Sequence, residues 1–222
     1  MDWSALTLSL QLGIWTILLL LPIAVIAARV LAYHRFPGRG LVEAALLLPL
    51  VLPPTVIGYY LLTAFGGASP VGVLWERAFG TPLVFSFSGL VAASVLINLP
   101  FAVQPMQRGF EAIPRDVLDA AACCGMSRWR IFTTIEAPLA WPGIVTGLVL
   151  SFAHTLGEFG VVLMVGGSIP GQTRTISIAI YDRVQAFDER AAGLMAATLL
   201  CLAVAALGLT YALSRRLDRK HG

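Results

Sequence analysis

The chain contains little charge: only 12% of its 222 residues are Asp, Glu, Lys or Arg. Soluble globular proteins carry about 25% charged residues, so this composition nearly excludes a soluble enzyme. The chain is 58% hydrophobic and its net charge is only +3, which excludes an intrinsically disordered protein. The basic residues are scattered between apolar runs rather than gathered in a patch, which argues against a nucleic-acid partner. The composition therefore predicts a polytopic membrane protein.

Several chemical signatures are also missing from the sequence. The three cysteines, Cys123, Cys124 and Cys201, cannot form a full disulfide framework, and we expect reduced thiols. No His or Cys lies at zinc-ligand spacing around them, and no Gly-x-x-x-x-Gly-Lys-Ser/Thr motif for nucleotide phosphates occurs. We therefore expect no metal, no cofactor and no ATP hydrolysis by this chain. The first apolar run has no basic residue before it and no cleavage site after it, which predicts a retained span.

A membrane-spanning helix needs about 20 mainly apolar residues. Five stretches qualify, and together they predict an all-α fold in a single domain over residues 1–222: residues 8–33, 41–64, 84–106, 139–165 and 193–214. The connections are short, apart from two longer polar segments at 107–138 and 166–192. The absence of an internal repeat disfavours a transporter built from two related halves in one chain. Residues 175–188 have apolar positions at helical spacing and predict an interfacial helix.

The distribution of Lys and Arg predicts the orientation, because cytoplasmic loops are rich in these residues. Four lie on one side of the predicted membrane: Arg77, Arg174, Arg183 and Arg190. Eleven lie on the other side: Arg29, Arg35, Arg39, Arg108, Arg115, Arg128, Arg130, Arg215, Arg216, Arg219 and Lys220. The richer side is expected to be cytoplasmic. This places the N-terminus outside, the C-terminus in the cytoplasm and the segment 107–138 in a cytoplasmic loop.

The cytoplasmic loop predicts two short helices. Pro114 suits a first helical position, and Asp116 is favoured in a first turn by the helix dipole. Gly125 can adopt the left-handed conformation that ends a helix. Ser127 is a preferred N-cap for a second, basic and aromatic helix over residues 128–132.

This loop resembles the cytoplasmic loop of permease subunits of ATP-binding-cassette importers. The family pattern is Glu-Ala-Ala, three residues, Gly, nine residues, and Ile-x-Leu-Pro. The matching positions here are Asp119, Ala120, Ala121, Gly125, Ile135 and Pro138. Two positions depart from the pattern: Asp replaces Glu at 119 and keeps the charge, and Ala replaces Leu at 137 and stays apolar. The resemblance extends over nearly the whole chain, because five spans with this loop before the fourth match the permease core.

The resemblance implies that the first loop helix is a coupling helix, which docks in a groove of a cytoplasmic ATPase subunit. Small residues at 120 and 121 allow two backbones to approach closely, and Asp119 offers a carboxylate to a basic or backbone partner. Arg128, Trp129 and Arg130 can extend this contact. The alternative is an amphipathic helix that lies on the membrane surface without a partner.

Two further segments resemble one branch of these permeases. The run Leu-Gly-Glu-Phe-Gly at 156–160 is similar to the sulfate and molybdate branch, and the segment 166–175 resembles the molybdate and tungstate permeases most. The resemblance implies import of molybdate across the plasma membrane of a prokaryote by alternating access. The implied partners are a second copy of the chain, two ATPase subunits and an extracytoplasmic molybdate-binding protein. The rival within the family is a sulfate or thiosulfate permease subunit.

Polar residues within the predicted spans are candidates for a gate or pathway, because such groups are costly in lipid and mark functional sites. They are Ser94, Asn98, Ser151, His154 and Glu158. Two hypotheses remain for Glu158: an outer gate in which it pairs with His154 or a loop Arg, or a purely structural hydrogen-bonding role. An intramembrane enzyme using His154 and Glu158 is a remote alternative. A passive channel is another, but it leaves the docking loop unexplained.

Overall fold

The computed structural model describes the backbone of residues 1–221 and the side chains of residues 1–206. Every regular element within residues 1–221 is helical, as predicted. The elements are α1 (Trp3–Tyr33), α2 (Arg39–Val51), α3 (Pro54–Phe65), α4 (Pro70–Phe79), α5 (Phe87–Glu111), α6 (Arg115–Cys123), α7 (Arg128–Ile131), a π-helical turn η1 (Phe132–Glu136), α8 (Ala137–Gly157), α9 (Gly160–Gly166), α10 (Ile176–Gln185) and α11 (Glu189–His221).

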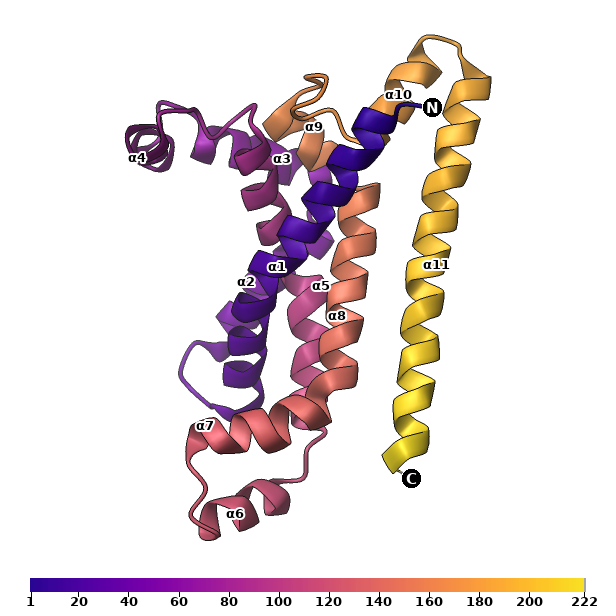
Figure 1. Cartoon of the computed structure of the whole chain (residues 1–222). Helices are drawn as coiled ribbons and strands as arrows, with labels where there is room; N and C mark the ends of the chain where they lie inside the picture. The colour runs from indigo at the N-terminus through magenta and orange to yellow at the C-terminus, as the bar shows by residue number, and fades with distance from the viewer. Residues whose placement is uncertain (222) are drawn as a thin grey trace.

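Helices α1, α5 and α8 pack side by side and form the core of the bundle (Figure 1). Leu20 of α1, Met106 and Phe110 of α5, and Ala140 of α8 are all fully buried in one apolar cluster. Gly143 lets α8 approach α5 closely, because a Cβ atom there would lie 2.5 Å from the carbonyl oxygen of Pro105. Small residues at the crossing therefore set the spacing of these helices.

Four helical stretches are long and apolar enough to cross a membrane, and five if a bent pair counts as one span: Trp3–Tyr33, Phe87–Glu111, Arg128–Gly157 and Glu189–Ala206, with α2 and α3 as the pair. This agrees with the predicted all-α membrane protein. Two groups of side chains fall outside the part that the structure describes. They are those of residues 207–214, at the end of the predicted fifth span, and those of Arg215, Arg216, Arg219 and Lys220.

The predicted second span, 41–64, consists of two helices instead of one continuous helix. The pair of α2 and α3 is bent by 113°. The break falls at Pro53 and Pro54, which lack the N–H that would continue the helical hydrogen bonds, and Pro54 instead begins α3. The pair thus forms a broken span or a re-entrant segment.

The predicted fourth span, 139–165, is wrong at both ends. Its helix begins at Arg128, because α7 runs through the π-helical turn into α8 without interruption. It ends at Gly157, and the extended Glu158 separates it from the short helix α9. Helix α9 packs against α3, so the break turns this segment towards the bent pair.

The remaining helices lie mainly at the two ends of the bundle. The N-terminus, α4, α9 and α10 lie at one end, and α6, α7 and the end of α11 lie at the other (Figure 1). Helix α10 falls within the segment 175–188 that predicts a helix. Helix α4 was not expected, because the sequence before the third span was interpreted as a short connection.

Candidate functional site

The loop between α5 and α8 carries the residues of the family pattern. Pro114 is the N-cap of α6 rather than its first residue, and Asp116 lies in the first turn. Gly125 follows α6 with φ of 77°, the left-handed conformation that suits glycine. Ser127 accepts a hydrogen bond from the Arg130 amide at 3.3 Å and caps α7. The two predicted loop helices are therefore present, one residue shifted at the start of α6.

The pattern residues divide between an exposed surface and a buried junction. Asp119, Ala120 and Gly125 are exposed at the end of the molecule, whereas Ala121 is buried beneath them. At the other end of the pattern, Ile135 lies half-buried in the π-helical turn and Pro138 lies in the first turn of α8. The loop thus offers small side chains and one carboxylate outwards, and it is continuous with a core helix.

A basic and aromatic surface adjoins α6. Arg128, Trp129 and Arg130 are all exposed, and the exposed fraction of Trp129 is 72%. The ring of Trp129 contacts that of Phe132, with centroids 5.6 Å apart. An exposed Trp flanked by two arginines is typical of a surface that contacts another protein.

An ion pair that the sequence analysis missed ties the loop to the core. The guanidinium of Arg29 in α1 pairs with both carboxylate oxygens of Glu136, and the Nη2–Oε1 distance is 2.9 Å. Glu136 is only 3% exposed. The rings of Tyr33 and Phe132 lie 5.8 Å and 5.7 Å from the guanidinium carbon. The pair joins residues that are 107 positions apart, so no local pattern in the sequence predicts it.

The polar residues predicted for a pathway lie together between α5 and α8. The amide nitrogen of Asn98 donates to the Ser94 carbonyl at 2.8 Å and to Thr155 Oγ1 at 3.0 Å. The Thr155 hydroxyl in turn donates to the Ser151 carbonyl at 2.8 Å. These contacts fix the amide, so its oxygen faces His154 Nδ1 at 3.1 Å, and that ring nitrogen must carry the hydrogen.

Glu158 continues this network in the extended segment after α8. Its Oε1 accepts a hydrogen bond from the Val161 amide at 2.8 Å and so caps α9. Its Oε2 lies 3.7 Å from His154 Nε2.

Most of the pathway candidates are enclosed by this chain rather than facing outwards. Ser94, Asn98 and Ser151 are fully buried, and the Oγ atoms of the two serines have no hydrogen-bond partner among the described residues. The side chain of His154 is 30% exposed, the most of the five. The hydrogen bond of Asn98 to Thr155 joins α5 to α8.

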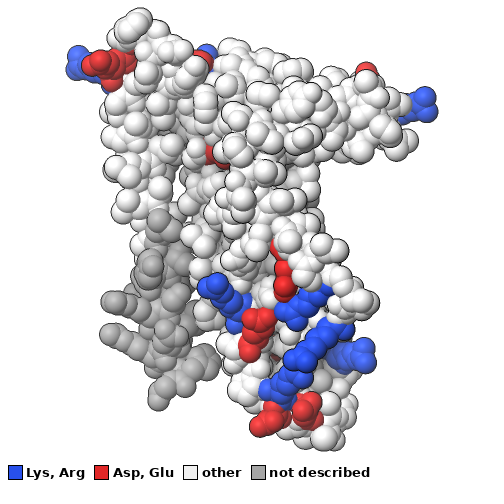
Figure 2. Space-filling view, turned by 180° about the vertical axis from the view of Figure 1, so that it is seen from behind, with Lys and Arg blue, Asp and Glu red and all other residues white. Residues whose placement is uncertain are grey.

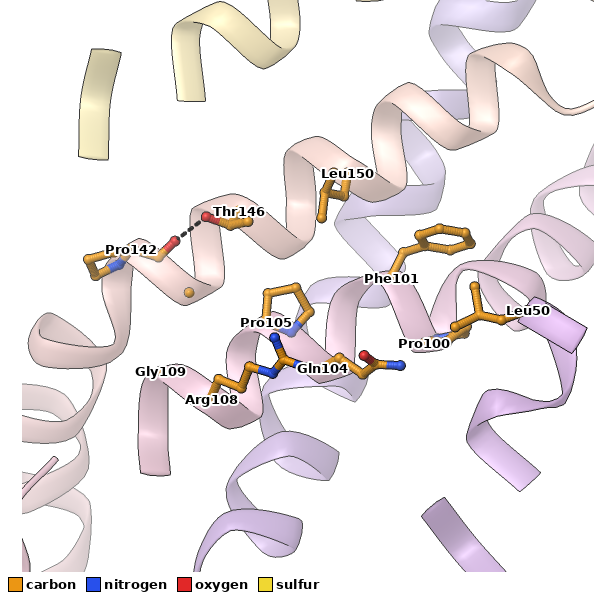
Figure 3. Close-up of a pocket in the computed structure, with 11 residues that line it drawn as sticks. Leu50, Pro100, Phe101, Gln104, Pro105, Arg108, Gly109, Pro142, Thr146 and Leu150 are labelled. Carbon is orange, nitrogen blue, oxygen red and sulfur yellow. Dashed lines mark hydrogen bonds between the residues drawn. The ribbon is translucent and has the colours of Figure 1, made fainter. Parts of the chain in front are cut away.

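A half-open cavity of about 660 Å³ lies next to this cluster, between α2, α5 and α8 (Figure 3). Phe101 lines the cavity and stacks on His154, with ring centroids 4.1 Å apart. The walls are mainly apolar and rich in proline, with Gln104, Arg108 and Thr146 as polar groups. Figure 3 shows the labelled residues of α5 and α8 around this cavity.

At the end of the molecule that carries α10, Asp2 holds the start of α1 to the loop before α10. Its carboxylate accepts a hydrogen bond from the Ala5 amide at 3.1 Å and pairs with Arg174. Partial burial raises the pKa of Asp2, but the hydrogen bonds from Ala5 and Ser4 and the charge of Arg174 lower the pKa further, to below its usual value.

Charge is distributed unevenly over the molecule. Figure 2 shows most of the coloured side chains gathered at the end that carries α6 and α7, with few at the opposite end and a nearly uncharged middle. An apolar middle between two charged ends is the surface expected of a protein that crosses a bilayer. The bundle thus combines an apolar middle with an exposed, charged loop at one end and a cavity that opens in its wall.

Comparison with known proteins identifies the class. Residues 20–220 match the family described as "Binding-protein-dependent transport system inner membrane component". The chain therefore belongs to this family and is a multi-pass protein of the bacterial inner membrane.

The similar proteins include several permeases. The chain is 46% identical to the molybdenum transport system permease protein ModB of Azotobacter vinelandii, over 84% of this chain and 83% of the relative. It is 40% identical to ModB of Escherichia coli (strain K12), over 83% and 80%. Identity to the sulfate transport system permease protein CysT of the same strain is 33%, over 87% of this chain and 69% of the relative.

Solved structures show the same fold at low identity. A bacterial alginate ABC transporter in complex with its periplasmic protein aligns with a TM-score of 0.75 at 18% identity, over 96% of this chain and 78% of that one. The MetNI methionine ABC transporter aligns with a TM-score of 0.69 at 14% identity, over 97% and 94%. The helical arrangement is thus that of importer permeases.

Proposed function

We propose that this chain is the permease subunit of an ATP-binding-cassette importer that carries molybdate into the cytoplasm. The observation that supports this most is the identity of 38–46% to molybdenum permeases from three bacteria, each over at least 80% of its length. The sulfate permease of Escherichia coli is more distant, at 33%. A sulfate or thiosulfate permease remains the rival function, since the two branches share the fold and the loop.

The proposed topology has five spans, with the N-terminus outside and the C-terminus in the cytoplasm. It counts α2 and α3 together as the second span. The loop helices α6 and α7 carry Arg115, Arg128 and Arg130, and the positive-inside rule favours such a segment on the cytoplasmic side. The chain lacks a phosphate-binding motif of its own, so ATP hydrolysis is assigned to a separate subunit.

The exposed surface of α6 is proposed to dock on that ATPase. Asp119 and Ala120 would face the partner, Gly125 would set the turn, and the aromatic surface at Trp129 would extend the contact. Movement of α6 reaches the core by two routes: the continuous helix from Arg128 into α8, and the ion pair of Glu136 with α1. This arrangement supports a loop that transmits movement rather than one that only rests on the membrane.

A second copy of the chain is proposed to complete the pathway. Helix α2 has no buried residue, and the cavity beside it is open on one side. A two-fold symmetric pair is the commonest way to cover such a surface. The pathway then runs between the two copies. His154, the most exposed of the five polar candidates, would lie in its wall, with the buried Ser94, Asn98, Ser151 and Glu158 behind it. An extracytoplasmic molybdate-binding protein would deliver the ion at the end that carries α4 and α10.

Uptake of labelled molybdate tests the proposal, in cells that lack their own importer and contain this chain with its ATPase and binding protein. We expect uptake that tungstate abolishes and excess sulfate does not. Strong competition by sulfate would move the chain to the sulfate branch.

Two pairs of variants test the loop in the same assay. Gly125→Val should abolish uptake because φ at 125 is 77°, whereas Gly193→Val, at a position with open space, should not. Asp119→Arg should abolish uptake, whereas Asp116→Asn on the same helix should preserve it. Normal uptake with Asp119→Arg would contradict the docking role of α6.

A further inference from the structure

We propose that the cavity between α2, α5 and α8 contains a binding site for a tetrahedral oxyanion, formed at its inner end by Arg108 and Gln104. The inference rests on the proposed function and adds a place where the ion pauses before release. No charged residue other than Arg108 lines this cavity within the described part of the chain.

Arg108 is available because its acidic neighbours are bound elsewhere. Glu43 and Glu111 lie near it around an adjacent pocket. The Arg39 guanidinium lies 2.9 Å from Glu43 Oε1 and 3.8 Å from Glu111 Oε1. Gln107 also donates to Glu111 at 2.9 Å. Among the described side chains, no carboxylate lies within ion-pair distance of Arg108, so its guanidinium has no direct ionic partner.

The position of Gln104 adds a second donor. Residues 104 and 108 are one helical turn apart on α5, about 6 Å along the axis, and so share a face. Figure 3 shows both side chains in the space between α5 and α8. A guanidinium and an amide N–H group match the oxygens of an oxyanion. The cavity of about 660 Å³ leaves room for the ion with part of its hydration shell.

The site is suited to weak, transient binding. Arg108 is exposed at the edge of this mainly apolar cavity, so water screens its attraction for an anion. A single cation does not hold the ion tightly, and conduction requires that an ion can leave. Arg108 lies three residues before the end of α5, which places the site at the proposed cytoplasmic end. The same guanidinium also stabilises the helix terminus, and the test below separates the two roles.

Thr146 provides a probe position across the cavity. It lies on α8, lines the same cavity as Arg108, and bonds only to the Pro142 carbonyl of its own helix, at 2.7 Å. In the complete transporter, the exposed Cys123, Cys124 and Cys201 are replaced by Ser and Thr146 by Cys. The new thiol is labelled with an anionic or a cationic thiosulfonate reagent, and the ratio of the two rates reports the local potential.

The expected result is that Arg108→Gln lowers the anionic-to-cationic rate ratio about 5- to 10-fold. Arg108→Lys should preserve the ratio, and Arg35→Gln, which removes an exposed arginine from the same proposed side, should not change it. With Arg108 present, tungstate should slow labelling and Gln104→Leu should weaken that protection. A merely helix-stabilising Arg108 predicts no protection by tungstate.

The outcomes distinguish the site from the proposed function. An unchanged rate ratio in Arg108→Gln, or no protection by tungstate with Arg108 intact, overturns the site even if molybdate is transported. Absence of molybdate uptake together with protection by sulfate overturns the molybdate assignment and leaves the oxyanion site in place. If the transporter with Arg108→Gln does not assemble, the protection by tungstate and its weakening in Gln104→Leu decide whether the oxyanion site exists.

Discussion

The core of α1, α5 and α8 and the bent pair of α2 and α3 are built in different ways. The core is held by fully buried apolar side chains, by close backbone approach at Gly143, and by hydrogen bonds between helices at Asn98. Helix α2 has no buried residue, and α3 buries only Gly58 and Phe65. The chain therefore specifies its core by itself, whereas the bent pair has surface left for another partner.

This difference explains how one chain can be both stable and movable. A wall of the cavity is formed by α2, the least buried of the long elements, and the opposite walls belong to the core. A movement of the bent pair against the core would change the cavity without breaking the buried hydrogen bonds of Asn98. Variants that perturb the core should cost stability, while matched variants in less packed regions should not.

The largest effect is expected at the closest approach of the core helices. Gly143→Leu would place a side chain against the Pro105 carbonyl and Gly109, which belong to backbone that cannot move aside. We expect a loss of about 3 kcal/mol of stability, measured as thermal unfolding of the purified protein in detergent. Gly193→Leu, where no atom lies within 4 Å, is the control. Equal stability of the two variants would show that the core is loosely packed.

The next largest effect separates two ion pairs. Glu136→Gln leaves Arg29 without its partner, and because Arg29 is 32% exposed we expect a cost of about 2 kcal/mol, less than for a fully buried pair. Glu43→Gln breaks the exposed pair with Arg39 on α2 and should cost less than about 0.5 kcal/mol. A double-mutant cycle with Arg29→Gln measures the first coupling. A coupling near zero would exclude this pair as a link between loop and core.

How far the sequence predicts this structure depends on how local each signal is. Apolar runs located the long helices, and Gly125 and Ser127 predicted the turn and cap of the loop, because hydropathy and capping act within a few residues. The ion pair of Arg29 with Glu136 depends on packing between distant segments. The break at Glu158 lies inside a stretch long enough for one span, and the contact of α9 with α3 beyond it joins segments that are far apart in the sequence. The sequence analysis placed Glu158 inside the fourth predicted span, whereas the structure places it in the extended segment after α8.

A smaller effect is expected at Asn98. Asn98→Leu removes the amide that joins α5 to α8 and leaves the Thr155 hydroxyl oxygen without a donor, at a cost of about 1–2 kcal/mol. Thr63→Val on α3 is the counterpart, because its hydroxyl bonds only to carbonyls of its own helix. That variant should change stability by less than about 0.5 kcal/mol. If Thr63→Val lost more stability than Asn98→Leu, the bent pair would be packed more tightly than this comparison assumes.

The smallest effect is expected at Glu158, where the gate and structural hypotheses diverge. Glu158→Gln keeps an oxygen that accepts from the Val161 amide, so stability should change by less than about 0.5 kcal/mol, whereas Glu158→Ala removes the cap of α9 and should cost about 1 kcal/mol. Ser69→Ala, which removes the cap of α4, should cost a similar amount.

Uptake then decides between the two hypotheses. A structural role predicts normal molybdate uptake with Glu158→Gln, because Gln keeps the oxygen that accepts a hydrogen bond from the Val161 amide. A gate that depends on the ionised carboxylate predicts a large loss of uptake in a variant as stable as the original. That loss, if it also followed from His154→Gln, would establish the pair as a gate and contradict the interpretation of Glu158 as a helix cap.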